Sequence, residues 1–195
     1  MSEKPIFFNT PMVQAILDGR KTQTRRVCTY VEDNSPVKLY GYNKLSEAGK
    51  TLLLESLVER SRIQLGDILW VRETWARISD WTIIDPTVGM VDGYIYKADW
   101  ASFEHPAWHP SIHMPRAAAR IFLRVTDVRV EKVRDISEEE AEAEGAKKMK
   151  ENDIGFWTYR RGFQSIWDSL YAKRGYGWDA NPWVWVYTFE RTEVV

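Results

Sequence analysis

The chain has 195 residues, a formal net charge of −1 and a single cysteine, Cys28. This length can bury a substantial core within one domain, and the near-zero charge provides no global positive field for nucleic acid, so any such contact needs a local basic patch. One cysteine excludes an internal disulfide and a cysteine-cluster zinc site, and the absence of a long apolar run predicts a soluble, cytoplasmic chain.

The first segment predicts a strand, a short helix and a basic turn. Ile6–Phe8 is apolar and strand-like, Thr10 is the predicted N-cap, and Pro11 suits the first helical position. Gly19 is expected to end the helix as a left-handed residue. Residues 22–27 then look extended, so the basic turn leads from a helix into a strand.

That turn, Gly19–Arg26, packs four cations and two threonines behind a glycine. A solvated basic connector is the plain structural explanation, because most charge runs are solvated. Side chains three apart point to opposite faces of a regular strand. Lys21 and Thr24 can therefore act together only if Lys21 lies in the turn before the strand, or if the strand carries a bulge.

The middle of the chain predicts an α+β pattern without βαβ alternation. The expected elements are a polar loop or insertion over residues 29–50, a short helix over Thr51–Arg60, and strands over Ile68–Trp75, Gly93–Ala98 and Ile121–Val133, the last with Ile121, Leu123 and Val125 facing inward. Strands spread over the chain, with helices between them, favour a small mixed β-barrel that carries helices on its outside.

Glu73 is one candidate acid in the predicted strand over Ile68–Trp75. Strand alternation places it on the same side as Val71, where a buried carboxylate needs a cation such as Arg25 or Lys21. The alternative is that Glu73 lines a pocket.

The three histidines, His105, His109 and His113, are spaced four apart, which suggests a metal site on one helix face. Pro106 and Pro110 interrupt any such helix and destroy the shared face. We therefore expect no metal and no cofactor, and we place His113 at the edge of a pocket.

A glutamate-rich segment predicts a second informative helix. Ser137 and Glu140 form a capping box, which specifies the helix start. A run of glutamates on one short helix is usually a solvated face. Glu144 differs, because it lies late in the run, where the helix dipole no longer favours it, and Gly145 follows directly.

The C-terminal part predicts a core-packing helix over residues 156–170, a break at Gly175–Gly177 and a final strand over Trp183–Glu190. The ten tryptophans are expected mainly in the core and the barrel wall. One or two in a pocket would suffice to stack a base.

Three motifs resemble those of ASCH domain proteins, and in particular the compact N4-acetylcytidine amidohydrolases. Gly19–Arg26 is similar to their Gly-Arg-Lys-Thr-x-Thr-x-Arg segment, Gly66–Leu69 to their Gly-Asp-x-Leu strand, and Ser137–Glu144 to their Thr/Ser-Glu-x-x-Ala-Glu-x-Glu helix start. His113–Arg116 and Asn181–Val186 resemble the longer ASCH proteins of bacteriophages and prophages. The chain is nearly twice the length of the compact enzymes.

The resemblance implies a single PUA-like (ASCH) α+β domain over residues 1–195, with insertions at about 29–62 and 78–118. It implies hydrolysis of N4-acylated cytidine to cytidine and a carboxylic acid, with Lys21, Thr24 and Glu144 as catalytic residues, Thr24 being the nucleophile or positioning water. The substrate-binding residues that we assign are Arg20, Arg25, Arg26, Glu73, Trp75, His113 and Arg116. The partner is a modified cytidine nucleoside or RNA. The alternatives are a non-catalytic module that binds RNA or a modified base, and a ribonuclease.

Overall fold

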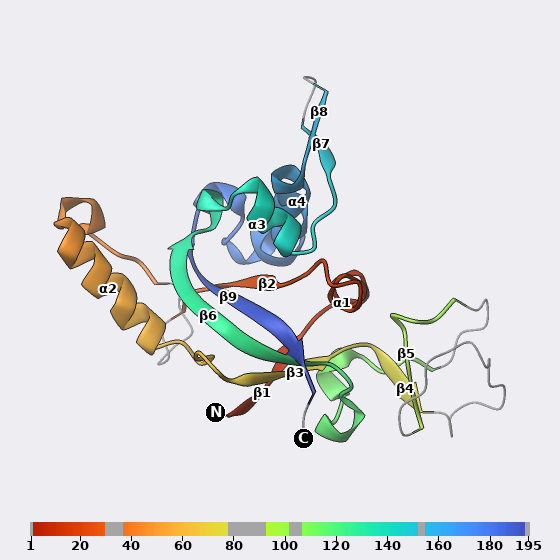
Figure 1. Ribbon diagram of the computed structural model, residues 1–195. Helices are drawn as coiled ribbons and strands as arrows, with labels where there is room; N and C mark the ends of the chain where they lie inside the picture. Colours follow the sequence, from red (N-terminus) through yellow and green to blue (C-terminus); the bar gives the residue numbers. More distant parts are fainter. Residues whose placement is uncertain (1, 30–36, 78–92, 102–106, 152–154, 194–195) are drawn as a thin grey trace. The chain divides into compact units, whose positions relative to one another are not determined.

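The computed structural model describes residues 2–29, 37–77, 93–101, 107–151 and 155–193 (Figure 1). The chain divides into two compact units. The first contains Met1–Gly19, Gly66–Arg124 and Glu190–Val195, and the second contains Arg20–Leu65 and Val125–Phe189. The single domain with insertions at 29–62 and 78–118 stays a prediction.

The main sheet is mixed, and its strand order is β1-β3-β6-β9-β2. Its strands are β1 (Glu3–Phe7), β2 (Gln23–Val27), β3 (Ile68–Arg72), β6 (Phe122–Lys132) and β9 (Trp183–Thr192). β1 and β3 are parallel, whereas β3 with β6 and β2 with β9 are antiparallel.

In the described part of the chain, two short hairpins and four α-helices accompany this sheet. β4 (Trp75–Arg77) pairs with β5 (Tyr94–Tyr96), and β7 (Met149–Glu151) pairs with β8 (Phe156–Thr158). The helices are α1 (Thr10–Leu17), α2 (Glu47–Glu59), α3 (Glu138–Ala143) and α4 (Tyr159–Tyr171). The predicted α+β class is confirmed. Within the described residues, no helix combines the length and the apolar character that a membrane span requires.

In the first unit, the helix α1 begins one residue earlier than its sequence suggested. The N-cap is Asn9, whose side-chain oxygen accepts a hydrogen bond from the Met12 backbone N–H at 3.0 Å, so the prediction of Thr10 was wrong. Asparagine caps at least as well as threonine, and its position here lets Thr10 and Pro11 form the first helical turn. Gly19 has a φ of 74°, as predicted for the residue that ends this segment.

The predicted strand over Ile68–Trp75 is two strands. β3 ends at Arg72, and β4 begins at Trp75. Trp75 leaves the main sheet because it pairs with Tyr96 of β5, while its backbone also exchanges hydrogen bonds with His109. The predicted alternation is confirmed, since Val71 and Glu73 are both buried.

In the second unit, hydrophobic clusters pack against both faces of β2 and β9. On one face, Val27 and Val186 belong to a cluster with Phe163 and Trp167 of α4. On the other face, the aromatic side chains of β9 pack with α2 in a cluster of Cys28, Val37, Leu57, Val130, Trp183, Trp185 and Tyr187. The tryptophans of β9 are thus core residues, as expected for aromatic residues in a buried strand. Burial also raises the pKa of the Cys28 thiol.

Two helix boundaries in this unit differ from expectation. α2 begins at Glu47 rather than Thr51, because Ser46 caps it by accepting a hydrogen bond from the Gly49 backbone N–H at 3.2 Å. α4 begins at Tyr159, so Phe156 precedes it in β8, where it is 70% exposed. The predicted helical spacing therefore holds only from Tyr159 onward.

Gly162 of α4 provides a sharp test of this packing. A β-carbon at Gly162 would lie 1.9 Å from the Lys147 carbonyl oxygen, whereas one at Gly49 of α2 would meet its first neighbour, the Ser46 hydroxyl, at 3.4 Å. We expect Gly162→Ala to lower the free energy of unfolding by about 1–3 kcal/mol, because backbone must move. Gly49→Ala should leave it unchanged or raise it by up to about 1 kcal/mol through helix propensity. Urea unfolding monitored by circular dichroism measures both, and equal effects would contradict this packing.

Candidate functional site

Lys21 lies in the turn before β2 and is fixed to the end of α3. It forms an isolated antiparallel bridge with Glu144, and the Thr22 backbone N–H donates to the Ala143 carbonyl oxygen at 2.8 Å. β2 begins only at Gln23. Lys21 therefore precedes the regular strand, which meets the first of the two conditions for its cooperation with Thr24.

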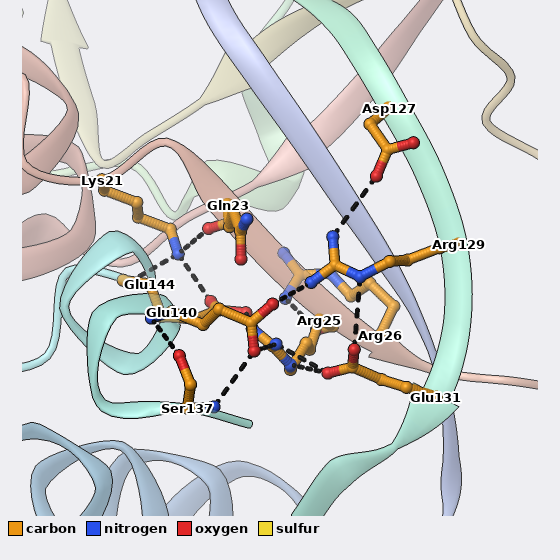
Figure 2. Close-up of polar contacts among 10 residues, drawn as sticks. All are labelled: Lys21, Gln23, Arg25, Arg26, Asp127, Arg129, Glu131, Ser137, Glu140 and Glu144. Carbon is orange, nitrogen blue, oxygen red and sulfur yellow. Dashed lines mark hydrogen bonds and ion pairs between the residues drawn. The ribbon is translucent and has the colours of Figure 1, made fainter. Parts of the chain in front are cut away.

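The Lys21 ammonium is completely buried, and three oxygen atoms of the described residues accept hydrogen bonds from it. Its Nζ donates to the Gln23 carbonyl oxygen at 2.7 Å, to the Glu144 carbonyl oxygen at 2.7 Å and to the Glu144 Oε2 at 2.9 Å (Figure 2). A lysine ammonium has three N–H donors, so these acceptors match its full donor capacity.

Two opposing effects act on the proton of Lys21. Burial lowers the pKa of Lys21 below its ordinary value, while the Glu144 carboxylate opposes this shift by stabilising the charged form. Arg26 and Arg25 lower the pKa further through charge repulsion. The net direction is downward, so Lys21 releases its proton more readily than an exposed lysine.

Glu144 is the C-cap of α3, at the point where the chain turns away. The capping box of Ser137 and Glu140 specifies the helix start, and Gly145 has a φ of 82° directly after Glu144. The Glu144 side chain is only 4% exposed. Glu144, the glutamate of this segment that helix stability explains least, is therefore buried and paired.

Arg25 is a fully buried cation shared by three carboxylates. Its Nη1 donates to Glu144 Oε1 at 3.1 Å, and its Nη2 donates to Glu140 Oε2 at 3.0 Å and to Glu131 Oε1 at 2.6 Å (Figure 2). Its Nε also donates to Glu131 Oε1, at 2.9 Å. Lys21 and Arg25 therefore hold the two oxygens of one carboxylate, Glu144, from opposite ends.

A second arginine extends this network toward the solvent. Arg129 of β6 contacts Glu140, and it reaches Glu131 Oε2 and Asp127 Oδ2, both at 3.3 Å (Figure 2). Sequence reasoning did not include Arg129 or Glu131 in the site, and it treated Glu140 only as a cap. One available signal was the spacing of Arg129 and Glu131, which places them on the same face of a strand.

Thr24 is buried, and its place on β2 is set by the strand register. Thr24 lies opposite Tyr187 and Arg25 lies opposite Val186, so alternation directs the Thr24 and Arg25 side chains to opposite faces. The Lys21 ammonium nevertheless contacts the peptide oxygen that directly precedes Thr24. Participation of the Thr24 hydroxyl stays a prediction.

The other arginines of the basic turn differ in exposure. Arg20 is exposed and lines a hollow of about 410 Å³. Arg26 is half-buried, and its Nη1 donates weakly to the Arg25 carbonyl oxygen at 3.4 Å. Arg20 is thus the cation of this turn that is best placed to meet a solvent-borne ligand, while Arg25 has a structural role in the network.

Glu73, in the first unit, is fully buried and paired. Arg120 donates to it through two parallel hydrogen bonds of 2.9 Å and 3.1 Å, and Arg120 also contacts Asp99. The prediction that Arg25 or Lys21 supplies the cation was wrong. Arg120, which follows the second predicted insertion, pairs with both carboxylate oxygens of Glu73. Burial raises the pKa of Glu73, although Arg120 opposes this shift.

The remaining predicted binding residues also belong to the first unit. Trp75 is buried with its ring centroid 4.9 Å from that of His109. His113 is exposed at the end of a short 3₁₀ turn, Ser111–His113. Arg116 forms an ion pair with Glu3 at 2.7 Å. Their assignment to a substrate stays a prediction.

His105 lies outside the described residues, so the spacing of the three histidines is not visible in full. Among the residues that the structure describes, no group of three histidine, cysteine, aspartate or glutamate side chains is arranged to hold a metal ion.

Glu144→Gln tests the electrostatics of the network directly. The variant keeps the shape of Glu144 but removes the charge that holds up the pKa of Lys21, so we expect the Lys21 pKa to fall further. Lysine-selective NMR titration measures this shift, and an unchanged or raised pKa would contradict the described pair.

We also expect Glu144→Gln to lower the free energy of unfolding by about 3–5 kcal/mol, because two buried cations lose a shared partner. Where the folded-state pKa of a lysine lies below the unfolded one, the unfolded chain binds more protons, so stability should rise with pH between the two values.

Comparison with protein-family models finds no match, and comparison with curated proteins also finds none. Two solved structures are similar to the chain, each with 13% sequence identity. One is an ASCH domain from Lactobacillus crispatus JV V101, with a TM-score of 0.42, covering 97% of this chain and 78% of that one. The other is a protein of Enterococcus faecalis V583 with the family label DUF984, with a TM-score of 0.40, covering 92% of this chain and 65% of that one. ASCH is the domain family that the three sequence motifs resemble, and the first of these two structures bears that name.

Proposed function

We propose that the second unit is an amidohydrolase that removes the acyl group from N4-acylated cytidine, with Lys21 and Glu144 as its proton-transfer pair. The observation that carries this proposal is the contact of Lys21 Nζ and Glu144 Oε2 at 2.9 Å between side chains that are 0% and 4% exposed. These two residues lie 123 positions apart, and the ASCH-like motifs had assigned catalytic roles to both.

Amide hydrolysis needs a base to activate the attacking oxygen and an acid to protonate the leaving nitrogen. Because burial lowers the pKa of Lys21, its neutral amine is accessible as the base. The proton taken from the attacking oxygen passes along the hydrogen bond to Glu144 and then to the N4 nitrogen. The acyl carbon–nitrogen bond breaks, one water molecule is consumed, and cytidine and a carboxylic acid leave.

The attacking oxygen belongs either to the Thr24 hydroxyl or to water. The first route forms an acyl-threonine ester that water then hydrolyses, and the second forms no covalent intermediate. Lys21 serves both routes, because its ammonium form can also stabilise the developing oxyanion once it has received a proton.

Arg25 is a positioning residue in this mechanism. It holds Glu144 Oε1 at 3.1 Å and leaves Oε2 directed at Lys21. Since Arg25 is itself fixed by Glu131 and Glu140, the carboxylate of Glu144 has little freedom to rotate. Such preorganisation lowers the cost of reaching the geometry for proton transfer.

The non-catalytic binding module is the second candidate function. One observation favours it, namely that the three acceptors around Lys21 match its three donors, as in an ion pair whose role is structural. Product analysis separates the candidates, because a binding module releases no cytidine. A labelled mixed RNA in the same assay tests for the strand cleavage of a ribonuclease.

Lys21→Arg and Lys21→Met distinguish a chemical role from a structural one. Arginine keeps the buried charge but does not release its proton in proteins, so we expect both variants to lose at least about 100-fold in the rate of cytidine release from N4-acetylcytidine. Lys173→Met, at an exposed lysine of the same unit, is the matched control and should keep the wild-type rate. Liquid chromatography of the products measures these rates. Full activity in Lys21→Arg, or no release by the wild-type protein, would overturn the proposal.

The role of the Thr24 hydroxyl needs a separate test, because the β2–β9 register directs the Thr24 and Arg25 side chains to opposite faces. Thr24→Val preserves shape and removes the hydroxyl, whereas Thr24→Ser preserves the hydroxyl. If Thr24 takes part, Thr24→Val loses most of the rate and Thr24→Ser retains a large share of it. Rapid quenching with mass spectrometry detects an acyl-threonine ester if the covalent route operates. Wild-type activity in Thr24→Val would exclude the hydroxyl from the mechanism.

A further inference from the structure

One buried polar atom beside the Lys21 and Glu144 pair takes no part in the proposed mechanism. This atom is the side-chain oxygen of Gln23, which is buried and has no hydrogen-bond partner among the residues that the structure describes. A buried acceptor without a donor is destabilising, because it has lost its contact with water and received no protein N–H or O–H in exchange. Such an atom needs an explanation, and a donor on the substrate is one.

The strand register places Gln23 on the same face as the network around Glu144. Gln23 and Arg25 lie two positions apart in β2, which pairs regularly with β9, so their side chains share one face. Arg25 contacts Glu144 on that face at 3.1 Å. The Gln23 carbonyl oxygen accepts from Lys21 Nζ at 2.7 Å, and Figure 2 shows Gln23 next to that ammonium. The Gln23 amide therefore lies beside the two groups that we propose transfer protons.

Gln23 differs from these neighbours in its exposure to solvent. The side chains of Lys21, Arg25 and Glu144 are buried, whereas Gln23 is half-buried. Because its Oε1 is buried while the residue as a whole is half-buried, Gln23 lies between the closed network and solvent. A substrate that approaches the pair across Gln23 brings its own donors to this oxygen.

An N4-acylated cytosine has a donor that suits a glutamine oxygen. Its amide nitrogen, N4, carries one N–H next to the bond that is cleaved, and the ring nitrogen N3 beside it is an acceptor. A glutamine side chain offers one acceptor oxygen and one NH₂ donor. Glutamine uses this pair of groups to contact the neighbouring donor and acceptor of adenine, and the same complementarity exists for N4–H and N3.

We propose that Gln23 recognises the base in this site, with its Oε1 accepting from the N4–H of the acylated cytosine and its Nε2 donating to N3. The inference rests on the proposed function, because it names the group that recognises the substrate of the same site. It also orients the leaving group. N4 keeps the hydrogen that Gln23 binds, its lone pair receives the proton from Glu144, and the acyl carbon–nitrogen bond breaks to release the amine.

The first experiment compares N4-acetylcytidine with N4-acetyl-N4-methylcytidine, which lacks the N–H. We expect the wild-type protein to prefer the former by at least about tenfold in kcat/KM. Gln23→Met keeps the length of the side chain but removes the amide, so it should lose most of this preference. Gln23→Glu keeps an acceptor oxygen and should keep the preference, although its added charge changes the absolute rate.

Gln164→Met is the matched control for these variants. Gln164 is half-buried in the same unit, and its side-chain oxygen accepts from Arg161 Nη1 at 2.9 Å. The same substitution there should keep both the wild-type rate and the preference for the N–H substrate. A preference that is unchanged in Gln23→Met, or lost equally in Gln164→Met, would overturn the proposal.

Thermal unfolding distinguishes recognition from a structural role of Gln23. Gln23→Met replaces an acceptor that has no partner among the described residues with apolar atoms, so its melting temperature should equal or exceed that of the wild-type protein. Circular dichroism measures this temperature. A lower melting temperature in Gln23→Met together with an unchanged substrate preference would show that Gln23 supports the fold, and would overturn the proposal.

Binding without chemistry separates this inference from the proposed function. Calorimetric titration with cytidine and with N4,N4-dimethylcytidine measures recognition of the N4 hydrogens through Kd alone. We expect the wild-type protein to bind cytidine at least about fivefold more tightly, and Gln23→Met to bind the two nucleosides alike. Equal binding of both nucleosides by the wild-type protein would overturn the inference.

The two proposals can therefore fail independently. Tighter binding of cytidine that depends on Gln23, without any deacetylation of N4-acetylcytidine, would refute the proposed function while leaving recognition by Gln23 intact. Deacetylation with the same preference for the N–H substrate in Gln23→Met would refute recognition by Gln23 while leaving the proposed function intact.

Discussion

The buried carboxylate of Glu144 is the group on which the rest of the second unit depends electrostatically. One of its oxygens accepts from Lys21 and the other from Arg25, and both cations are completely buried. A charge removed from water costs several kcal/mol unless a close partner compensates it. The contact also joins the turn before β2 to the end of α3, so that the strand and the helix are held together by the same group that we propose transfers protons.

This arrangement separates positioning from chemistry. Arg25 is surrounded by carboxylates from β6 and α3, which fixes its guanidinium and, through it, one oxygen of Glu144. Lys21 is different, because burial lowers its pKa while the Glu144 carboxylate opposes this shift. A group balanced in this way can change protonation during a reaction, whereas an arginine cannot.

The cations of the basic turn, Gly19–Arg26, differ in their exposure to solvent. Lys21 and Arg25 point inward and are neutralised, whereas Arg20 faces a hollow that Lys147 and Lys148 also line. The overall charge of −1 conceals this division, because Glu131, Glu140 and Glu144 offset the buried cations of the turn. A local cationic surface can therefore exist on a chain with no net positive charge.

Local rules in the sequence predicted much of the fold and part of the site. The capping box at Ser137, the left-handed Gly19 and the burial of alternate residues in β3 follow from interactions within a few residues, and the structure has all three. Such rules were less exact at boundaries, where Asn9 and Ser46 competed with other capping residues. The choice of partners depends on tertiary structure. Sequence analysis gave Glu73 a cation from the basic turn, but Arg120 reaches it, and it did not include Glu131 in the network around Arg25.

What the sequence determined by itself was which residues are chemically unusual: a lysine in a basic turn before a strand, and a glutamate at the end of a helix that does not need it. Only the tertiary structure decided that Lys21 and Glu144, 123 positions apart, touch at 2.9 Å with side chains that are 0% and 4% exposed. The physical reason is that burial and charge pairing depend on every element packed around a group. Local sequence specifies the conformation of each element, but the energy of a buried charge is set by neighbours that come from distant parts of the chain.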